Sequence, residues 1–284
     1  MISRLLSLFK KINLLIFFIL VSIVFAGCFW KRIPYNQEQL DAFYDRKENT
    51  QLIFETDAGQ QVAYYIPPLE QPEKIPKKLA ILYPGIQSVA LDWLKFIRLE
   101  DDPKTGFLLI DYPGRGFSEG LMNPAELYEI SEGALSTLAK NFKVNKIDAE
   151  LCLMGHSFGT GIALQFASRK KVTRIVLVAP FTTLRKAAAQ NSYIIWFFMP
   201  NQIDNRELIK SILAKESAPQ IIIFHGTRDK SIPVGMGREL KEISPNEIEF
   251  YAIIDGGHSD ILTTYRELIF YSLLGADTLY SSSQ

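Results

Sequence analysis

The stretch "LCLMGHSFGTGIAL", residues 151–164, changes its apolar spacing at the pentapeptide GHSFG, whose central residue is Ser157. Consecutive apolar residues before the pentapeptide are typical of a buried strand, and those after it recur with helical spacing. Gly155 and Gly159 stand two positions before and after the serine, where larger side chains would make strand and helix collide. The pattern predicts a sharp turn that exposes Ser157 as a nucleophile.

Size and composition favour one large α/β domain. The chain has 284 residues, of which 48% are apolar and 22% charged. Basic and acidic residues both number 31, and no long basic run offers a surface that neutralises phosphates. Nucleic acid is therefore not an expected partner. The two cysteines, Cys28 and Cys152, cannot build a disulfide framework, and Cys152 is interpreted as a small buried residue within an apolar run.

Strand-like and helical segments alternate after residue 50. The runs QLIFET and QVAYYIP predict an opening hairpin, and further strands are predicted from KLAILYP, FLLIDYP, AELCLMG, TRIVLVAP, QIIIFHG and EIEFYAIID. Such unalternated runs suit strands that are buried on both faces of a mostly parallel sheet. Helices are expected at residues 89–99, 158–168, 234–243 and 259–274. The alternation predicts a doubly wound α/β fold.

Two further segments between the strands have distinct patterns. One predicted helix begins with Asn123 as N-cap, Pro124 as the first helical residue and Glu126 completing a capping box. Its expected apolar face is Leu127, Ile130, Ala134, Leu138 and Phe142. The connection between Pro180 and Pro219 is too long for a simple crossover and contains "YIIWFFMP". It is interpreted as a helical insertion over the sheet.

A serine nucleophile needs a base, and the chain has three histidines. His156 is adjacent to Ser157, and residues next to each other around so tight a turn point apart. His225 ends the run QIIIFHG and is expected to have a structural or hydrogen-bonding role. His258, in "DGGHSD", follows the last predicted strand, and two glycines let its loop curl inward. His258 is therefore the expected base.

The carboxylate that orients the base is expected between serine and histidine in the chain, after the penultimate strand. Asp229, in "HGTRDKSIP", stands at that place. Asp255 and Asp260 are alternatives beside His258, although their closeness in sequence makes a contact with the far imidazole nitrogen difficult. The expected catalytic residues are thus Ser157, Asp229 and His258.

In this order and at these strand ends, the three residues resemble the α/β-hydrolase superfamily over about residues 51–274. The loop "IDYPGRGFSEG", residues 110–120, is similar to the loop after the fourth strand in the monoglyceride-lipase, depalmitoylase and serine-peptidase-like branches. The resemblance implies an eight-stranded, mostly parallel sheet with a helical cap after strand six, here at about residues 181–217.

The loop after the third predicted strand departs from the family pattern. Members commonly have His-Gly there, whereas this chain has "YPGIQS", and Pro84 lacks an N–H group. The expected oxyanion donors are the backbone N–H groups of Ile86 and Phe158.

These features predict a serine hydrolase that cleaves small acyl substrates, carboxylic esters first, through an acyl-enzyme intermediate. The chemistry needs no cofactor and no metal ion, and the histidines are not clustered with carboxylates at ligand spacing. A thioesterase or a peptidase for small acyl-amides is an alternative, because the same three residues do not select the leaving group. An aspartate-dependent dehalogenase is disfavoured because serine stands at position 157. An inactive envelope scaffold on a hydrolase fold is the alternative of another class.

The N-terminus has the pattern of an export signal. Arg4, Lys10 and Lys11 precede "INLLIFFILVSIVFAGC", which ends at Cys28. The apolar run has about 15 residues, which is short of the roughly 20 that span a bilayer. Small residues before Cys28 resemble the bacterial lipobox, although Phe25 stands where Leu is usual. Lipidated Cys28 is the first interpretation, an uncleaved membrane anchor is the second, and a buried helix is the third.

The expected domain organisation follows from these segments. Residues 1–28 are the signal or anchor, 29–49 a polar linker, 50–276 the hydrolase domain and 277–284 a tail. We expect the protein in the cell envelope, bound to the membrane by its N-terminus, with the catalytic domain outside the cytoplasm.

Overall fold

The computed structural model describes residues 32–124, 126–191 and 203–275. The expected leader at 1–28, the tail at 277–284 and the run "YIIWFFMP" at 193–200 lie outside the described residues. Within those described ranges, none of the helices has both the length and the apolar character needed to cross a membrane.

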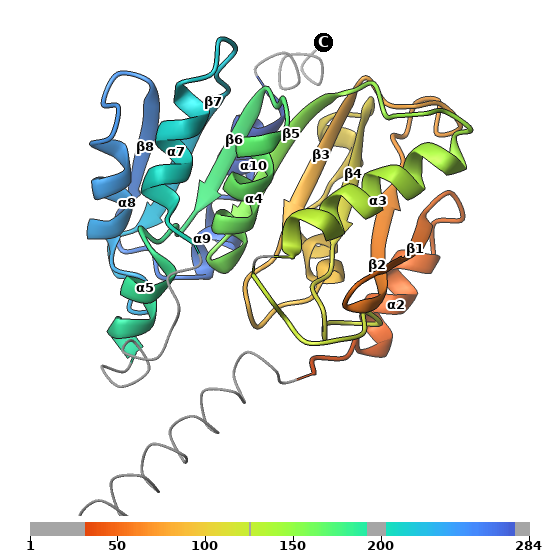
Figure 1. Ribbon diagram of the computed structural model, residues 1–284, viewed down its shortest axis with the longest axis horizontal. Coiled ribbons are helices and arrows are strands. Elements are labelled where there is room, and N and C mark those ends of the chain that lie inside the picture. Colours follow the sequence, from red (N-terminus) through yellow and green to blue (C-terminus); the bar gives the residue numbers. More distant parts are fainter. Residues whose placement is uncertain (1–31, 125, 192–202, 276–284) are drawn as a thin grey trace, which may run out of the picture.

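One sheet of eight strands forms the centre of the domain, in the order β1-β2-β4-β3-β5-β6-β7-β8 (Figure 1). The strands are β1 (Thr50–Thr56), β2 (Gly59–Ile66), β3 (Lys78–Tyr83), β4 (Thr105–Ile110), β5 (Glu150–His156), β6 (Arg174–Val178), β7 (Gln220–Gly226) and β8 (Ile248–Ile253). Strand β2 pairs antiparallel with both β1 and β4, and all other pairs are parallel. The mostly parallel α/β fold expected from the sequence is confirmed.

Because β3 to β8 run in the same direction, their carboxyl ends meet at one edge of the sheet. We call this edge, with the loops that follow β3, β4, β5, β7 and β8, the catalytic edge. It is the usual place for binding and catalysis in open α/β sheets. The opposite edge, where these strands begin, is the amino edge.

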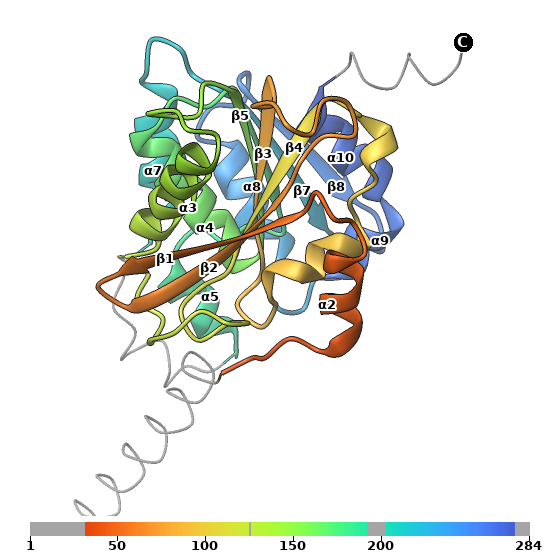
Figure 2. The ribbon, with the colours of Figure 1, turned by 90° about the vertical axis from the view of Figure 1, so that its right-hand side faces the viewer.

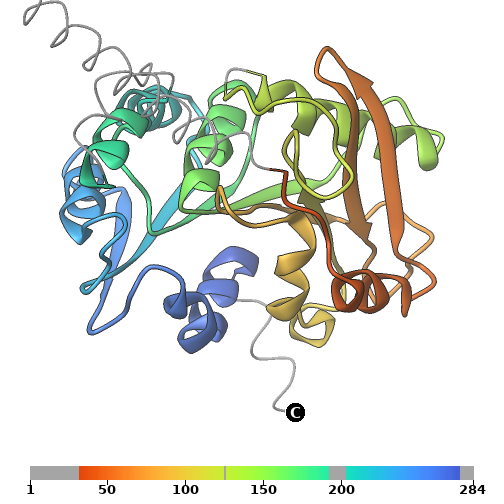
Figure 3. The same cartoon turned by 90° about the horizontal axis from the view of Figure 1, so that it is seen from below.

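Helices cover both faces of the sheet (Figures 2 and 3). One face carries α3 (Leu127–Asn141), α4 (Phe158–Arg169), α7 (Asn205–Leu213) and α8 (Val234–Lys241). The other carries α2 (Gln37–Tyr44), the 3₁₀ helix η1 (Ala90–Lys95), α9 (Asp260–Thr264) and α10 (Arg266–Leu274). Burial on both sides explains why the central strands β3 and β4 are apolar without alternation.

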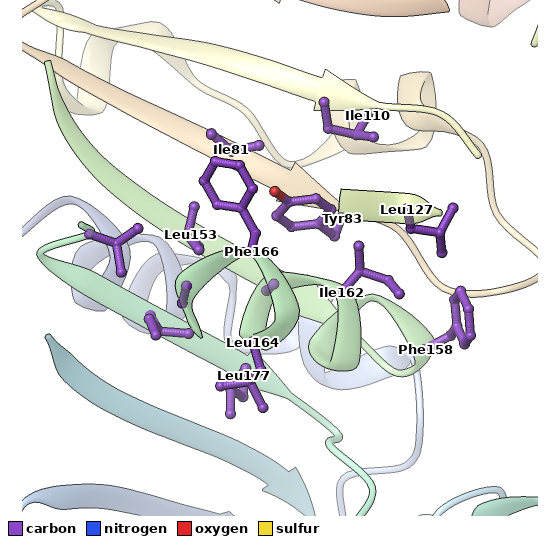
Figure 4. Close-up of a cluster of buried hydrophobic side chains, with 14 of the residues drawn as sticks. Ile81, Tyr83, Ile110, Leu127, Leu153, Phe158, Ile162, Leu164, Phe166 and Leu177 are labelled. Atoms are coloured by element: carbon purple, nitrogen blue, oxygen red, sulfur yellow. The ribbon is translucent and has the colours of Figure 1, made fainter. Parts of the chain in front are cut away.

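The core beneath α4 fixes the position of that helix (Figure 4). Ile162 and Phe166 of α4 are fully buried in one cluster with Ile81, Leu153 and Leu177 of the neighbouring strands. Each such side chain contributes roughly 1.5–3 kcal/mol by leaving water. The first turn of α4, directly after Ser157, is thereby held at the catalytic edge.

The start of α3 differs from the prediction. The helix begins at Leu127, and Glu126 is its N-cap without a side-chain capping bond. Asn123 donates from Nδ2 to Glu126 Oε1 over 2.5 Å, so this side-chain pair replaces the expected capping box. The predicted apolar face is otherwise buried at Leu127, Ile130, Ala134 and Leu138.

Two other predicted helices are interrupted. Residues 89–99 contain η1, followed by a second 3₁₀ turn, η2 (Leu99–Asp101), in place of one α-helix. The first N–H group of η1, that of Ala90, donates to the Asp111 carboxylate. Residues 259–274 divide into α9 and α10 at Tyr265. The next residue, Arg266, is buried and donates from Nε to the Phe96 carbonyl, a tertiary contact that no local pattern shows.

Part of the expected linker belongs to the folded domain. Helix α2 has a capping box between Asn36 and Gln39, and its Phe43 is fully buried. Gln39 Nε2 also donates to Asp92 of η1 over 2.9 Å. The folded part of the chain therefore begins before residue 50, which corrects the linker boundary.

The two described ends of the long connection after β6 are hydrogen-bonded to each other. Leu184 N donates to the Ile203 carbonyl over 3.0 Å, and Asn205 N donates to the Thr182 carbonyl over 2.8 Å. The described parts of this connection hold α5 (Leu184–Asn191) and α7. The extent of the cap, at about residues 181–217, stays a prediction.

Candidate active site

Ser157 lies at the turn between β5 and α4 with φ 54° and ψ −118°, a conformation that is rare outside glycine. A Cβ on Gly155 would lie 2.3 Å from the Gly159 carbonyl oxygen, and one on Gly159 would lie 2.2 Å from the Tyr83 carbonyl oxygen. Both positions therefore exclude a side chain. The backbone conformation of Ser157 costs about 1–3 kcal/mol of strain. It places the Ser157 side chain at the catalytic edge.

The structure brings the three expected side chains into one hydrogen-bonded chain. His258 Nε2 lies 2.9 Å from Ser157 Oγ, and His258 Nδ1 lies 2.7 Å from Asp229 Oδ2. The Asp229 side chain is fully buried, whereas that of His258 is 21% exposed. A carboxylate accepts from Nδ1–H, so Nε2 is left to accept a proton from the serine.

Asp229 is stabilised as a carboxylate. Burial alone would raise its pKa, but contacts with His225 and His258 and a hydrogen bond from Ile232 N–H outweigh that effect and hold the pKa well below its usual range. Its other oxygen accepts the N–H groups of Ser231 and Ile232, each over 2.8 Å. The side chain is thus oriented and ionised before any substrate binds.

The two alternative carboxylates face elsewhere. Asp255 forms an exposed ion pair with Arg228 over 2.8 Å. Asp260 Oδ1 accepts the N–H of Gly257 over 2.7 Å. In this geometry Asp229 is the carboxylate that contacts the His258 ring.

His225 is buried behind Asp229. Its Nε2 donates to the Ile232 carbonyl over 2.8 Å and lies 3.5 Å from Asp229 Oδ2. The bond to Ile232 agrees with the hydrogen-bonding role expected for this histidine, and it also braces the loop that carries Asp229.

His156 contacts the base. Its Nε2 donates to the backbone carbonyl of His258 over 2.9 Å, and the centres of the two rings are 5.0 Å apart. Burial, and then the neighbouring His258, lower the pKa of His156 to about 4. A neutral His156 therefore holds the His258 loop without adding a positive charge beside it at neutral pH.

The loop after β3, which carries the expected oxyanion donor Ile86, is hydrogen-bonded to side chains of the loop after β4. Tyr112 donates its hydroxyl to the Pro84 carbonyl over 2.8 Å. The buried Arg115 donates from Nε and Nη2 to the Ile86 carbonyl over 3.1 and 2.8 Å. These bonds fix the carbonyl groups of Pro84 and Ile86, the two residues that flank Gly85.

The two expected oxyanion donors belong to segments that adjoin Ser157. A Cβ on Gly85, the residue before Ile86, would lie 3.7 Å from Ser157 Cβ. Phe158 is the first residue of α4, where backbone N–H groups point outward from the helix and carry partial positive charge. An anion formed on an acyl group at Ser157 Oγ would therefore face this region.

The described residues contain no group of three or more His, Cys, Asp or Glu side chains that could hold a metal ion. A cavity of about 790 Å³ lies at the amino edge, lined by residues such as Lys77, Glu132 and Thr173. The cavity is distant from Ser157, which follows the end of β5. Two of its lining residues are Lys77, directly before β3, and Glu150, the first residue of β5.

Comparison with known proteins agrees with the fold. Residues 81–205 match a family described as "alpha/beta hydrolase fold". The chain has the α/β-hydrolase fold. It is 28% identical over 155 residues to the α/β hydrolase domain-containing protein aho-3 of Caenorhabditis elegans. That alignment covers 53% of this chain and 43% of aho-3. The chain is 26% identical over 159 residues to the lysophosphatidylserine lipase ABHD12 of Bos taurus, covering 49% and 38%.

Solved structures show the same fold. An α/β-hydrolase of Vibrio vulnificus matches with a TM-score of 0.67 at 16% identity, covering 89% of this chain and 94% of that one. An esterase of Pyrococcus furiosus matches with a TM-score of 0.63 at 17% identity, covering 84% and 94%. The aligned region spans less than half the length of the curated relatives described above. Together the family and the relatives support a hydrolase.

Several residues around the site could not be assigned a role from the sequence. Tyr112 and Arg115 belong to the loop "IDYPGRGFSEG", whose family likeness was recognised without a role for either side chain. The bond of His156 to the His258 carbonyl spans 102 positions in the chain. A motif can mark such residues, but it does not show which distant backbone atom they contact.

Proposed function

We propose that this α/β-hydrolase is a serine hydrolase that cleaves carboxylic esters through an acyl-enzyme intermediate. The observation that carries the proposal is the hydrogen-bonded chain from Ser157 through His258 to Asp229, with distances of 2.9 and 2.7 Å. The three residues lie on loops after β5, β7 and β8, and sheet geometry gives them a common edge.

Acylation begins when Ser157 Oγ attacks the acyl carbon and His258 Nε2 takes the hydroxyl proton. Asp229 stabilises the imidazolium that forms and keeps Nδ1 protonated. His258 then protonates the leaving alcohol as the bond between the acyl carbon and its oxygen breaks. Water activated by His258 attacks the acyl-serine, which releases the acid and restores Ser157.

The developing oxyanion is assigned to the N–H groups of Ile86 and Phe158. Deletion of one such donor costs roughly 3–4 kcal/mol of transition-state stabilisation in enzymes of this kind. Donors fixed before the reaction are the most effective, since they need not reorganise during it. The bonds of Tyr112 to Pro84 and of Arg115 to Ile86 support this assignment because they hold the loop rigid.

Acyl lipids are the favoured substrate class. The lysophosphatidylserine lipase among the relatives and the esterase among the solved structures both cleave esters by name. The proposal extends that chemistry to this chain, without a choice of head group.

The test is a labelled fluorophosphonate probe on the purified protein, followed by matched esters, thioesters and amides of graded acyl length. We expect labelling of one serine and turnover of esters above that of thioesters and amides. A preference for thioesters or amides would reassign the leaving group. No labelling and no turnover of any of the three classes would support the inactive scaffold instead.

We also propose that the N-terminus anchors the protein to a membrane outside the cytoplasm, through lipidated Cys28. The support is the sequence alone: a basic start, a short apolar run and small residues before the cysteine. Two acyl chains on a cysteine bury enough CH₂ groups, at about 0.8 kcal/mol each, for stable anchoring.

Cys28→Ser is expected to leave a larger, unprocessed precursor and to abolish incorporation of labelled fatty acid. Cys152→Ser is the matched control, because Cys152 is buried and should not change either measurement. A membrane-bound wild-type protein that still begins at Met1 would favour the uncleaved anchor. A wild-type protein found in the soluble cytoplasmic fraction would contradict both forms of anchoring.

A further inference from the structure

The start of the described chain is docked on the loop after β4. Ile33 N donates to the Gly114 carbonyl over 3.1 Å, and Gly116 N donates to the Ile33 carbonyl over 2.7 Å. The Tyr35 hydroxyl donates to the buried Asp111 carboxylate. A Cβ on Gly116 would lie 2.2 Å from the Tyr35 ring, so the contact is close enough to require glycine. The N-terminal segment therefore belongs to the catalytic edge.

Little chain separates this docking point from the apolar run. Ile33 follows Cys28 by five positions. An extended chain spans at most about 3.6 Å per residue, so Ile33 lies within roughly 18 Å of Cys28. Both forms of anchoring place Cys28 at or near a bilayer surface. Either one thus keeps the loop at Gly114 and Gly116 close to that surface.

One side chain of the same loop, that of Arg115, contacts the segment that adjoins Ser157. Arg115 stands between the two glycines that bind Ile33, and its guanidinium donates to the Ile86 carbonyl. Ile86 follows Gly85, which lies against Ser157. In Figure 1 the described chain begins, in red, at the lower edge of the molecule, and the arrowhead of β6 points toward that edge.

Large apolar side chains are exposed along this edge. Phe117 and Leu121, in the loop after β4, are 44% and 61% exposed, and Ile254, directly after β8, is 69% exposed. Leu121 follows Gly120, which packs against Ala58 in the turn between β1 and β2. Side chains of this kind lower their free energy by entering an apolar phase.

We propose that the catalytic edge rests against the lipid bilayer that holds the N-terminus, and that the enzyme takes its acyl ester directly from that bilayer. The inference rests on the proposed ester hydrolysis and on N-terminal anchoring. The short tether determines which edge approaches the lipid, and Phe117, Leu121 and Ile254 supply the apolar contact. A substrate whose acyl chain lies in the bilayer then reaches Ser157 without crossing water.

The first test compares two leucines in the full-length protein, reconstituted in phosphatidylcholine vesicles that contain a long-chain monoacylglycerol. Leu121→Glu places a charge on the catalytic edge. Leu69→Glu is the matched control: Leu69 is 43% exposed and lies at the amino edge, where Glu70 N donates to the Pro103 carbonyl. We expect Leu121→Glu to lower vesicle turnover by about 10-fold or more, the range for one leucine leaving an apolar phase.

Both variants should hydrolyse a short soluble ester at the wild-type rate. Equal vesicle turnover in the two variants would overturn the proposed orientation. Failure of the wild-type protein on the soluble ester would instead contradict the proposed hydrolase, so the two outcomes are separate.

The second test measures orientation without activity. Leu121→Cys and Leu69→Cys proteins carry a fluorophore in vesicles whose phospholipid head groups bear a nitroxide quencher, and the wild-type protein gives the labelling background. Strong quenching at position 121 and weak quenching at position 69 are expected. Equal quenching at both positions, or more at 69, would overturn the proposal. So would a cross-link between two copies at position 121 without quenching, which would assign this edge to a second copy of the chain.

Discussion

Ser157→Ala is expected to abolish ester hydrolysis and fluorophosphonate labelling, with a loss in kcat of about 10⁶-fold, as for the nucleophile of a comparable catalytic triad. The reason is that Ser157 Oγ is the atom to be acylated and lies 2.9 Å from the base. The fold should persist, because alanine keeps the same Cβ in the turn between Gly155 and Gly159. Circular dichroism and a thermal melt check the fold, and steady-state kinetics measure the loss.

Ser168→Ala is the matched control for that experiment. Ser168 lies near the end of α4, and its hydroxyl donates to the Gln165 carbonyl over 2.8 Å, away from the catalytic edge. This variant should retain both activity and labelling. Labelling that persists in Ser157→Ala would show that another residue is acylated, and it would contradict the assignment of Ser157.

Asp229→Asn is expected to lower kcat by about 10⁴-fold, because an amide can stabilise the wrong tautomer of the base. Asn keeps an oxygen that can accept the N–H groups of Ser231 and Ile232, so the loop should still fold. Asp255→Asn and Asp260→Asn are the controls and should retain most activity, since their carboxylates contact Arg228 and Gly257. A rate for Asp229→Asn near that of wild type would move the acid to another residue.

The pH dependence of stability offers a second measurement on Asp229. Its pKa in the folded protein is lowered from a reference value of about 3.9. The ionised side chain therefore contributes to the free energy of unfolding above about pH 4, and that contribution is lost as the pH falls further. The difference in melting temperature between wild type and Asp229→Asn should therefore shrink as the pH falls below about 4.

Features that depend on contacts within a short segment could be predicted from the sequence. The glycines around Ser157 are needed because Gly155 packs on Gly159, four residues away. The strands β3 and β4 were recognisable because burial on both faces demands unbroken apolar runs. Loops after parallel strands share one edge, so the places of Ser157, Asp229 and His258 along the chain predicted that they would meet.

Local rules failed in two places, once through a competing local bond and once through a tertiary contact. The capping box at Asn123 did not form, since the Asn123 amide bonds to the Glu126 carboxylate and α3 begins later. Residues 37–44 are polar enough to resemble a linker, yet Phe43 is fully buried against the domain. A single buried aromatic residue can bind such a helix to the core, and composition averaged over the segment conceals it.

The sequence by itself determined the α/β class of this protein, the turn at Ser157 and the order of the candidate catalytic residues, because these follow from local sterics and from which strand ends lie together. Only the tertiary structure decided that Arg115 holds Ile86, that His156 holds the His258 backbone and that Ile33 docks beside the site. Each of those bonds joins segments far apart in the chain. Their partners are set by the positions of whole strands and loops, which the packing of both core layers fixes together.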